Sequence, residues 1–412
     1  MQDKHASDKL IFCIFCIAVV QLVFGLAFTV PTNQLPQFLE QMVVKTTQDP
    51  FQIGLFLGLF PVAALFLPSG WKRSGFVLTS LTLELLIIAI SWQPAFIGVI
   101  TRAGGLSAVL SVALLLILMV RRPQERRRIL LGLCHGLTLP LLYAGSSVVM
   151  RVYVFSGSVY DMYYYLADLH LGPPLGFTIS ALATRQFWFY TAGYLIYFSL
   201  SHLMALVAGL WFHHRKGPNP NIFFIACALL GNVGYTQFPG VGPKNFFQHL
   251  FPFDPPAPLA PHVMDFPEAR RSAMPSLHVM WSYAVWMGAV GLRLVFRRLA
   301  LVYLLCMQVC AFLGPHYTVD IIAALGFAPA VHWWCRREKT RTVKDLGYPV
   351  CFLATLGYLG LLVWGSSVWI VWPWLLQGSS LLLLASSVYL SRRLYRRSLE
   401  TPTKLEPALQ VP

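Results

Sequence analysis

The feature that most constrains this chain is a repeated pattern of apolar runs, each near twenty residues long. A helix of that length crosses the roughly 30 Å hydrocarbon core of a bilayer. Only 11% of the 412 residues are charged and 57% are hydrophobic, whereas soluble domains carry about 25% charged residues. A water-soluble core of this size cannot bury so much apolar surface. The sequence therefore predicts an all-α polytopic membrane protein.

About twelve segments are predicted transmembrane helices. They are 10–30, 51–69, 76–97, 102–120, 129–148, 186–212, 221–237, 276–294, 299–314, 317–335, 347–365 and 367–390. The first is longer than the apolar region of a signal peptide, about 7–15 residues, and no small-residue cleavage site follows it, so we interpret it as a retained helix. The eight cysteines lie in or at the ends of apolar runs, which does not indicate a disulfide framework.

The basic residues predict the orientation, because cytoplasmic loops of membrane proteins retain lysine and arginine. If the amino terminus is inside, both termini are cytoplasmic and 24 of the 31 basic residues lie in inside segments. The exceptions are Lys45, Arg102, Arg151, Arg185, Lys244, Arg270 and Arg271. The net charge of +15 is therefore spread over short clusters between apolar runs, which favours a bilayer and no nucleic acid as partner.

Two predicted outside loops are long, at 149–185 and 238–275, and long loops in compact folds are usually functional. Three consecutive tyrosines at 163–165 suit the headgroup layer of a membrane. Asp161, Asp168 and His170 could shape a headgroup pocket, but we interpret them as solvated loop residues. We expect the other histidines to lie on the surface (His249, His262) or packed within helices (His135, His202).

One segment with chemistry is 314–320, which reads Gly-Pro-His-Tyr-Thr-Val-Asp at the outer start of the tenth span. With Pro315 near the first helical position, His316 and Asp320 are i and i+4 and share a face. A carboxylate beside one imidazole nitrogen fixes the tautomer and leaves the other nitrogen as a nucleophile. A helix amino terminus also favours phosphate. Alternatively, the pair is a solvated histidine and a helix-capping aspartate.

The other segment is 274–278, Met-Pro-Ser-Leu-His, at the outer start of the eighth span. Ser276 is a plausible helix cap, which places His278 in the first turn at the membrane depth of His316. A lone histidine here would more often be a packed interfacial residue. Two histidines and an aspartate at one depth and on one side predict a catalytic site facing the extracytoplasmic or lumenal side, because ionisable groups in a span are costly.

These two segments resemble the type 2 phosphatidic acid phosphatase superfamily, which carries a Pro-Ser-x-His motif and a later His-x-x-x-Asp motif. Residues 274–278 and 238–244 look like its inositol phosphorylceramide synthase (inositolphosphotransferase) branch, which acts in sphingolipid metabolism. The resemblance implies a lipid phosphotransferase in which His316 forms a phosphohistidine, Asp320 orients it, and His278 protonates the leaving oxygen. It covers about residues 121–340, with six predicted spans as in the family core.

The domain organisation follows from this coverage. We predict accessory helices in 1–120, a six-helix catalytic core in 121–340, and two accessory helices with a basic tail in 341–412. Lys244 matches the lysine of the phosphatase branch, but the Arg-Pro after it and the Ser-Arg before the last histidine are absent. With fewer cations, a phosphodiester suits the site better than a monoester. Arg270 and Arg271 could replace the missing charge, and with Lys244 and Ser276 they are the predicted substrate-binding residues.

Two other functions remain open. A lipid phosphate phosphatase would use the same chemistry, and incubation with labelled lipids would distinguish free phosphate from a new lipid. A membrane transporter would show two similar halves and polar groups at mid-membrane, whereas these polar groups lie at the outer interface of one half. No His/Cys cluster has zinc spacing and no glycine-rich loop indicates a nucleotide, so we expect no metal and no cofactor.

Overall fold

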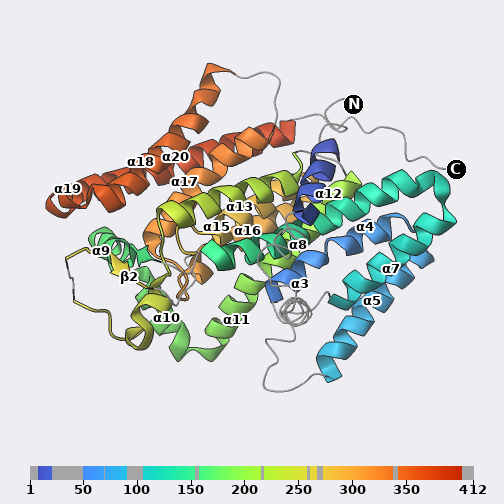
Figure 1. The fold of residues 1–412 in the computed structure, drawn as a ribbon, viewed down its shortest axis with the longest axis horizontal. Helices are drawn as coiled ribbons and strands as arrows, with labels where there is room; N and C mark the ends of the chain where they lie inside the picture. The colour runs from blue at the N-terminus through green and yellow to red at the C-terminus, as the bar shows by residue number, and fades with distance from the viewer. Residues whose placement is uncertain are drawn as a thin grey trace.

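The computed structural model describes residues 8–20, 50–68, 70–90, 105–153, 157–214, 218–257, 260–266, 272–336 and 342–400. Within these ranges the chain is mostly helical, and its long helices run side by side as a bundle (Figure 1). Short helices and a two-stranded antiparallel sheet gather at one end of the bundle. In that sheet β1 (Ser158–Val159) pairs with β2 (Met264–Asp265), which joins the two predicted outside loops.

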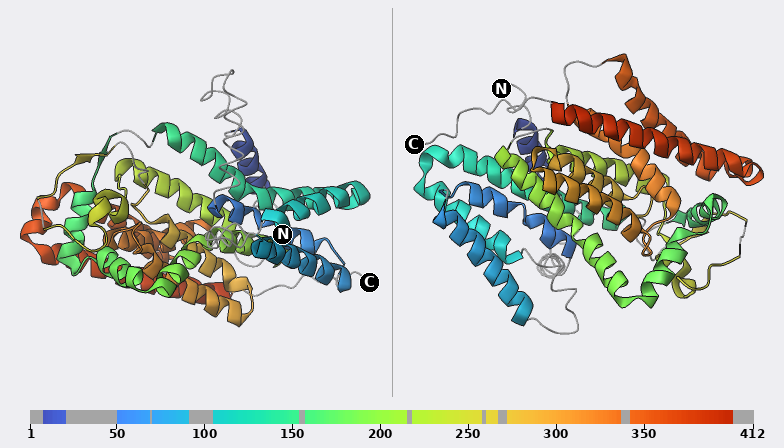
Figure 2. Two further views of the ribbon diagram at one scale, coloured as in Figure 1. Left: turned by 90° about the horizontal axis from the view of Figure 1, so that it is seen from below. Right: turned by 180° about the vertical axis from the view of Figure 1, so that it is seen from behind.

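The amino-terminal helices lie along one flank of the bundle (Figures 1 and 2). They are α3 (Pro50–Phe56), α4 (Leu59–Leu65), α5 (Trp71–Ile90), α7 (Gly105–Arg121), the 3-10 turn η2 (Pro123–Glu125) and α8 (Arg126–Tyr153). The predicted span 51–69 is thus interrupted by a turn at 57–58, and α7 meets α8 at a bend of 115° between the segments 107–121 and 123–144. Helix α3 packs against α8 and α12, which brings this flank onto the rest of the bundle.

The central part of the chain runs from 158 to 335. Its helices are α9 (Asp161–Leu171), α10 (Leu175–Arg185), α11 (Phe187–Phe198), α12 (Leu200–His214), α13 (Pro220–Gln237), α14 (Pro243–Phe247), α15 (Leu277–Gly288), α16 (Leu294–Ala311) and α17 (Thr318–Cys335). Helix α15 packs against α12, α13, α16 and α17. Its side chains from Val279 to Met287 are all buried, as expected for a helix that is apolar all round and surrounded by protein.

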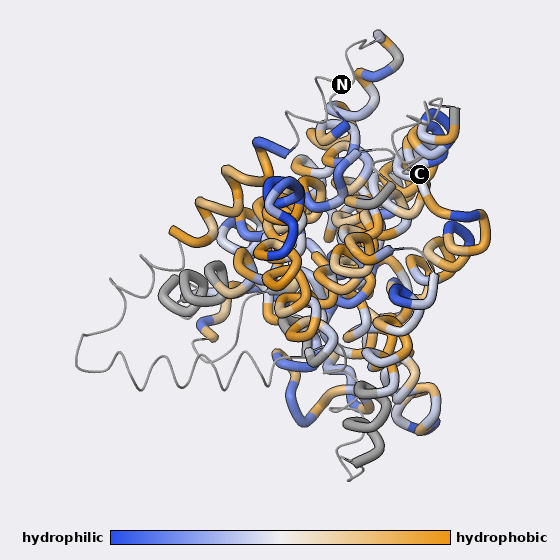
Figure 3. The backbone as a smooth tube through the Cα atoms, turned by 90° about the vertical axis from the view of Figure 1, so that its right-hand side faces the viewer, coloured by the Kyte–Doolittle hydropathy of each residue, from blue (hydrophilic) through white to orange (hydrophobic). Residues whose placement is uncertain are grey.

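The carboxyl-terminal helices α18 (Gly347–Trp364), α19 (Ser366–Val371) and α20 (Pro373–Glu400) cover α17 on the opposite flank (Figure 2). Among the described residues, five stretches are long and apolar enough to cross a membrane: Phe187–Phe212, Leu294–Ala311, Thr318–Cys335, Gly347–Trp364 and Pro373–Leu399. Counting the bent α7 and α8 pair as one span would make six. Apolar residues also dominate the long helices when the chain is coloured by hydropathy (Figure 3).

These helices fit a multi-pass membrane protein, but the predicted number of twelve spans and the six-helix core are not confirmed. Several predicted spans are too short or broken. The span 276–294, for example, is a 12-residue helix followed by a 3-10 turn at Ala289–Gly291. Part of the spans 10–30 and 76–97 lies outside the described residues. Hydropathy finds apolar runs well, but it does not distinguish a membrane crossing from a helix buried inside the protein.

The two long loops are more ordered than the sequence suggests. The first contains α9 and α10, and the second contains α14, a 3-10 turn (Gln248–Leu250) and β2. Tyr164 and Tyr165 are buried on α9, at 0% and 1% exposure, so their rings contact protein rather than the lipid headgroups that the sequence suggested. Their hydroxyls donate to backbone carbonyls of the second loop, to Phe238 at 3.1 Å and Pro256 at 2.6 Å. The hydrogen bonds of these two tyrosines therefore join the first long loop to the second.

Candidate active site

His316 is buried, at 2% exposure, in the turn between α16 and α17. Its Nδ1 lies 3.0 Å from the carbonyl oxygen of Ala273 and 3.4 Å from Oδ2 of Asp320. A carbonyl oxygen only accepts hydrogen bonds, so Nδ1 carries the proton and Nε2 holds the lone pair. Nε2 is buried and has no hydrogen-bond partner among the described residues. This tautomer presents an uncommitted basic nitrogen, as a nucleophile requires.

Ala273 stands just before the Pro-Ser-Leu-His segment, and its N–H donates to the carbonyl of Gly240 at 3.0 Å. The backbone N–H of Ser276 donates to the carbonyl of Asp320 at 3.4 Å. Three segments far apart in sequence, near residues 240, 274 and 316, are therefore joined by backbone hydrogen bonds. This network of backbone hydrogen bonds, and not a helix, holds His316 in position.

The start of α17 differs from the sequence-based expectation. The helix begins at Thr318, so Pro315 and His316 precede it and do not form its first turn. Asp320 still reaches His316, and its Oδ2 also accepts from the N–H of Tyr317 at 3.0 Å. The carboxylate thus both caps the helix and lies beside the imidazole. Because carboxylates already accept from the N–H groups of Tyr317, Thr318 and Val319, these three groups are not open to a phosphate.

His278 lies in the first turn of α15, with its ring centroid 6.0 Å from that of His316. The sequence-based prediction that these two histidines lie together is confirmed. Nδ1 of His278 is 2.9 Å from the hydroxyl of Tyr197 on α11, and the two rings stack at 3.9 Å. Sequence reasoning missed Tyr197, because one tyrosine in an aromatic-rich span carries no signal of its own.

Asp161 and Asp168 on α9 are buried, at 0% and 2% exposure, so the interpretation of both as solvated loop residues is wrong. Asp161 accepts hydrogen bonds from the backbone N–H groups of Val241 and Gly242 and from the hydroxyl of Tyr317. Asp168 accepts from the start of α17. Their spacing of seven residues, which puts both on one helix face, is a signal that could have identified them.

Both carboxyl groups have shifted proton affinities. Burial raises the pKa of Asp161 to about 7, although its hydrogen bonds from Val241, Tyr317 and Gly242 act in the opposite direction. Burial likewise raises the pKa of Asp168 to about 7, against the hydrogen bonds that its carboxylate accepts. His170 at the end of the same helix is half-buried, with its ring edge against Trp369 at 5.5 Å. It does not line the cavity, described below, that His278 and His316 share.

Two glycines allow the loop after α13 to approach the His316 turn. Gly242 has φ +83°, and a Cβ there would lie 2.1 Å from the carbonyl oxygen of Pro315. Gly314 has φ +117°, and a Cβ there would lie 2.7 Å from Cβ of Lys244. Glycine is the residue that adopts this left-handed backbone without steric cost. A backbone hydrogen bond joins the two segments where they meet: the Lys244 N–H donates to the Gly314 carbonyl at 3.0 Å.

The four predicted substrate-binding residues lie in different environments. Lys244 is exposed near His316, with Nζ 3.3 Å from the hydroxyl of Tyr194. Ser276 is fully buried and caps α15, its hydroxyl accepting from the N–H of Val279 at 3.4 Å. Ser276 thus fits the helix-cap role and does not line the cavity described below. Arg270 and Arg271 lie outside the described residues.

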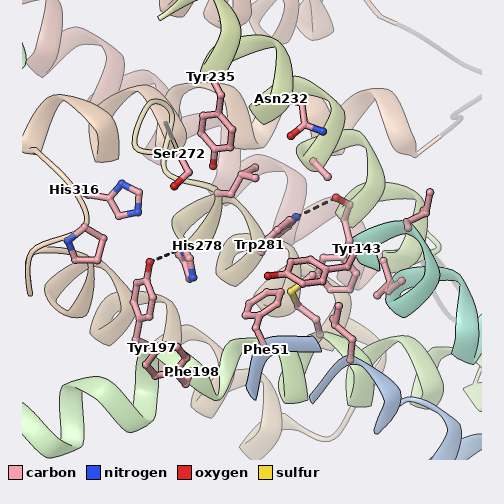
Figure 4. Close-up of a pocket in the computed structure, with 18 of the residues that line it drawn as sticks. Phe51, Tyr143, Tyr197, Phe198, Asn232, Tyr235, Ser272, His278, Trp281 and His316 are labelled. Atoms are coloured by element: carbon pink, nitrogen blue, oxygen red, sulfur yellow. Dashed lines mark hydrogen bonds between the residues drawn. The ribbon is translucent and has the colours of Figure 1, made fainter. Parts of the chain in front are cut away.

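Both histidines face a cavity of about 510 Å³ (Figure 4). Its polar end is lined by Lys244, Asn245, Ser272, His278 and His316. The rest is largely apolar and extends between α3, α8, α12, α13 and α15. A volume in the range of about 300–1,000 Å³ suits a small molecule or part of a lipid. The arrangement places a basic nitrogen, a second imidazole and one cation at the end of an apolar chamber.

Three other histidines occupy the environments expected for them. His249 and His262 are exposed, and His135 is packed within the bundle, with Nε2 3.2 Å from Oδ1 of Asp8. Among the described residues, no group of three or more His, Cys, Asp or Glu side chains has the arrangement of a metal site.

Comparison with curated proteins and with solved structures gives no match. Comparison with family models gives one, to the PAP2 superfamily, over residues 166–334. The matched region begins within α9 and ends within α17, so it contains His278, His316 and Asp320 together with Asp168. It suggests an enzyme of the lipid phosphatase or phosphotransferase type. The match is at the level of the PAP2 superfamily, and the inositol phosphorylceramide synthase branch is not confirmed.

Proposed function

We propose that this chain is a membrane lipid phosphotransferase that acts through a phosphohistidine on His316. The observation that carries the proposal is the environment of the His316 ring. Nδ1 donates to the Ala273 carbonyl, while Nε2 has no partner among the described residues and the ring lines a cavity that also contains His278. A buried, uncommitted imidazole nitrogen facing a second imidazole suits covalent transfer of a phospho group.

In the proposed reaction, the Nε2 lone pair of His316 attacks phosphorus, and the bond from phosphorus to the leaving oxygen breaks. His278 supplies the proton that the leaving alcohol needs. In the second half, an acceptor hydroxyl attacks the phosphohistidine, His278 takes the hydroxyl proton, and the N–P bond breaks. Asp320, 3.4 Å from Nδ1, stabilises the positive charge that develops on the His316 ring in both steps.

We infer a lipid phosphodiester as the donor. The cavity is mostly apolar, which suits a hydrocarbon chain, and Lys244 is the single Lys or Arg among the described residues that line it. A phosphodiester carries one negative charge and a monoester nearly two, so one cation matches the diester better. Phosphatidate-type hydrolysis is the second candidate. It is favoured by the exposure of Lys244, which leaves the polar end of the cavity within reach of water.

The experiment is a donor comparison with purified protein in lipid nanodiscs. A labelled lipid phosphodiester and a phosphatidate are offered at equal concentration, while a hydroxyl-bearing lipid acceptor is raised. We expect the diester to be used better and the label to move from hydrolysis product into a new lipid, because a bound hydroxyl competes with water through proximity. Preference for the monoester, with free phosphate unaffected by acceptor, would favour the phosphatase. No turnover of either lipid would contradict both.

A further inference from the structure

The cavity extends beyond the histidines into a part of the chain that precedes the PAP2-like region. Phe51 and Leu55 on α3 and Leu139, Leu142 and Tyr143 on α8 line it. All five come before residue 166, where the family match begins. The amino-terminal helices therefore complete the chamber in which the proposed chemistry takes place.

An aromatic cluster lines the cavity between the histidines and this end. The ring of Phe51 lies 6.0 Å from His278, 5.6 Å from Trp281 and 5.2 Å from Tyr143, measured between centroids. Figure 4 shows Phe51, Trp281 and Tyr143 on the side of His278 away from His316. The chamber thus has a polar end at His316 and an apolar end at α3 and α8.

The apolar end suits a hydrocarbon chain. Leu55, Leu139, Leu142 and Met204 line it, and none of the described lining residues there is charged. Apolar cavities of this kind stay dry and bind apolar molecules, because water finds no hydrogen-bond partners in them. Since this end is continuous with the polar end, one molecule can place an apolar chain here and a polar group at the histidines.

The wall formed by α3 packs closely against α12. Gly54, between Phe51 and Leu55, brings α3 against α12 so closely that a Cβ there would lie 2.2 Å from Oγ of Ser201. At Gly58, at the start of α4, a Cβ would lie 3.0 Å from the backbone carbonyl oxygen of Ala205 on α12. Because α3 and the start of α4 pack this closely against α12, the wall has little room to move back, and the size of the Leu55 side chain sets the space in front of it.

We infer that α3 and α8 form the end wall of a lipid-chain site and that Leu55 determines which chain length fits. The inference rests on the proposed function for the identity of the substrate, a lipid with a phosphate at one end and a hydrocarbon chain at the other. The chain lies along the apolar end past Phe51, and its phosphate lies at His316. Leu55 is thus a specificity-determining residue outside the PAP2-like region.

The test measures kcat/KM for a donor series with one chain varied from short to long, in wild type, Leu55→Trp and Leu55→Ala. Each methylene that the site buries adds about four-fold to binding, equivalent to about 0.8 kcal/mol. We expect Leu55→Trp to lose about ten-fold on long chains relative to short ones. Leu55→Ala shifts the preference toward longer chains.

The matched control is Leu57, a half-buried leucine two residues further on that does not line the cavity. Leu57→Trp and Leu57→Ala should keep the wild-type chain preference. A Leu55 series that parallels wild type at every chain length would overturn the inference, even if total activity falls.

A second measurement separates this inference from the proposed function. This measurement needs no turnover and is made in a His316→Ala background. Non-hydrolysable phosphonate lipids of increasing chain length are added, and the rise in Tm that each one causes is recorded. We expect the chain-length optimum to move with Leu55→Trp and Leu55→Ala as it does for kcat/KM. An optimum that does not move refutes the chain site whatever the reaction is. A shifted optimum in a protein that turns over no lipid phosphate would refute the reaction alone.

Discussion

Asp168 on α9 and Thr318 at the start of α17 are joined by two hydrogen bonds to one carboxylate oxygen. Oδ2 of Asp168 accepts from the backbone N–H of Thr318 at 2.9 Å and from its hydroxyl at 3.0 Å. Oδ1 accepts from the N–H of Val319 at 3.2 Å. Since Thr318 lies two residues after His316, a residue in the first long loop fixes the helix start next to the proposed nucleophile.

The first prediction concerns this positioning role. Asp168→Asn keeps the shape but places an amide NH₂ against a donor, so we expect kcat to fall about ten- to one-hundred-fold, the scale of a lost charged hydrogen bond. KM for the lipid donor should change little, because Asp168 does not line the cavity. Asp254→Asn, an exposed carboxylate in the second loop, is the matched control. A rise in KM at constant kcat would contradict the positioning role.

The second prediction is a pH dependence of stability. Burial raises the pKa of Asp161 to about 7 from an ordinary value of 3.8. Between these values the folded protein holds a proton that the unfolded chain has released, so stability is greatest below the lower pKa and falls as pH rises to about 7. One such group contributes a slope of up to about 1.4 kcal/mol per pH unit.

The measurement is the unfolding free energy of wild type, Asp161→Asn and Asp254→Asn between pH 4 and pH 8. Asp161→Asn removes the titrating group, so its profile should be flatter than that of wild type. Asp254→Asn should keep the wild-type slope. Equal slopes in all three proteins would show that Asp161 is ionised throughout this range in the folded state.

The third prediction is that His316→Ala abolishes turnover and leaves the fold intact. Removing a covalent nucleophile from a hydrolase lowers kcat on the order of 10⁶-fold. The structural cost is smaller, about 1–3 kcal/mol, because one buried carbonyl, that of Ala273, loses its donor. His249→Ala, at an exposed histidine, is the control. Near wild-type activity in a folded His316→Ala protein would exclude the phosphohistidine.

The fourth prediction isolates the hydrogen bond between Tyr197 and His278. Tyr197→Phe keeps the ring that stacks on His278 at 3.9 Å and removes the hydroxyl that lies 2.9 Å from Nδ1. A net hydrogen bond is worth about 0.5–1.5 kcal/mol, so we expect kcat to fall up to about ten-fold with donor binding retained. Tyr303→Phe removes a hydroxyl that bonds the Ile196 carbonyl and serves as control. Equal effects of both variants would indicate a general packing defect.

The sequence identified the proposed reacting groups because their spacing is local. Ser276 and His278 follow one proline, and His316 and Asp320 follow another, so the members of each pair are within four residues of each other whatever the tertiary structure is. Their convergence could be predicted from the common membrane depth of two helix starts. The centroid distance of 6.0 Å between the imidazoles agrees with that prediction.

The groups that support the site could not be found in the same way. Asp161 and Asp168 act on residues about 80 and 150 positions later, through hydrogen bonds to backbone N–H groups that have no sequence signature. The acceptor of the His316 Nδ1 proton is a backbone carbonyl, which any residue at position 273 would supply. Local patterns thus predict the side chains proposed to react, whereas the partners that orient them depend on tertiary contacts.

The last prediction concerns the side of the membrane on which the site lies. Basic residues are retained on the cytoplasmic side during insertion, and 24 of the 31 lie in segments that place the 238–275 loop outside. His262 is exposed in this loop, so His262→Cys in a protein whose eight native cysteines are replaced should react with an impermeant thiol reagent added from outside. The cysteine-free protein is the control. Labelling that requires access to the cytoplasmic side would reverse the orientation and place His278 and His316 on the cytoplasmic face.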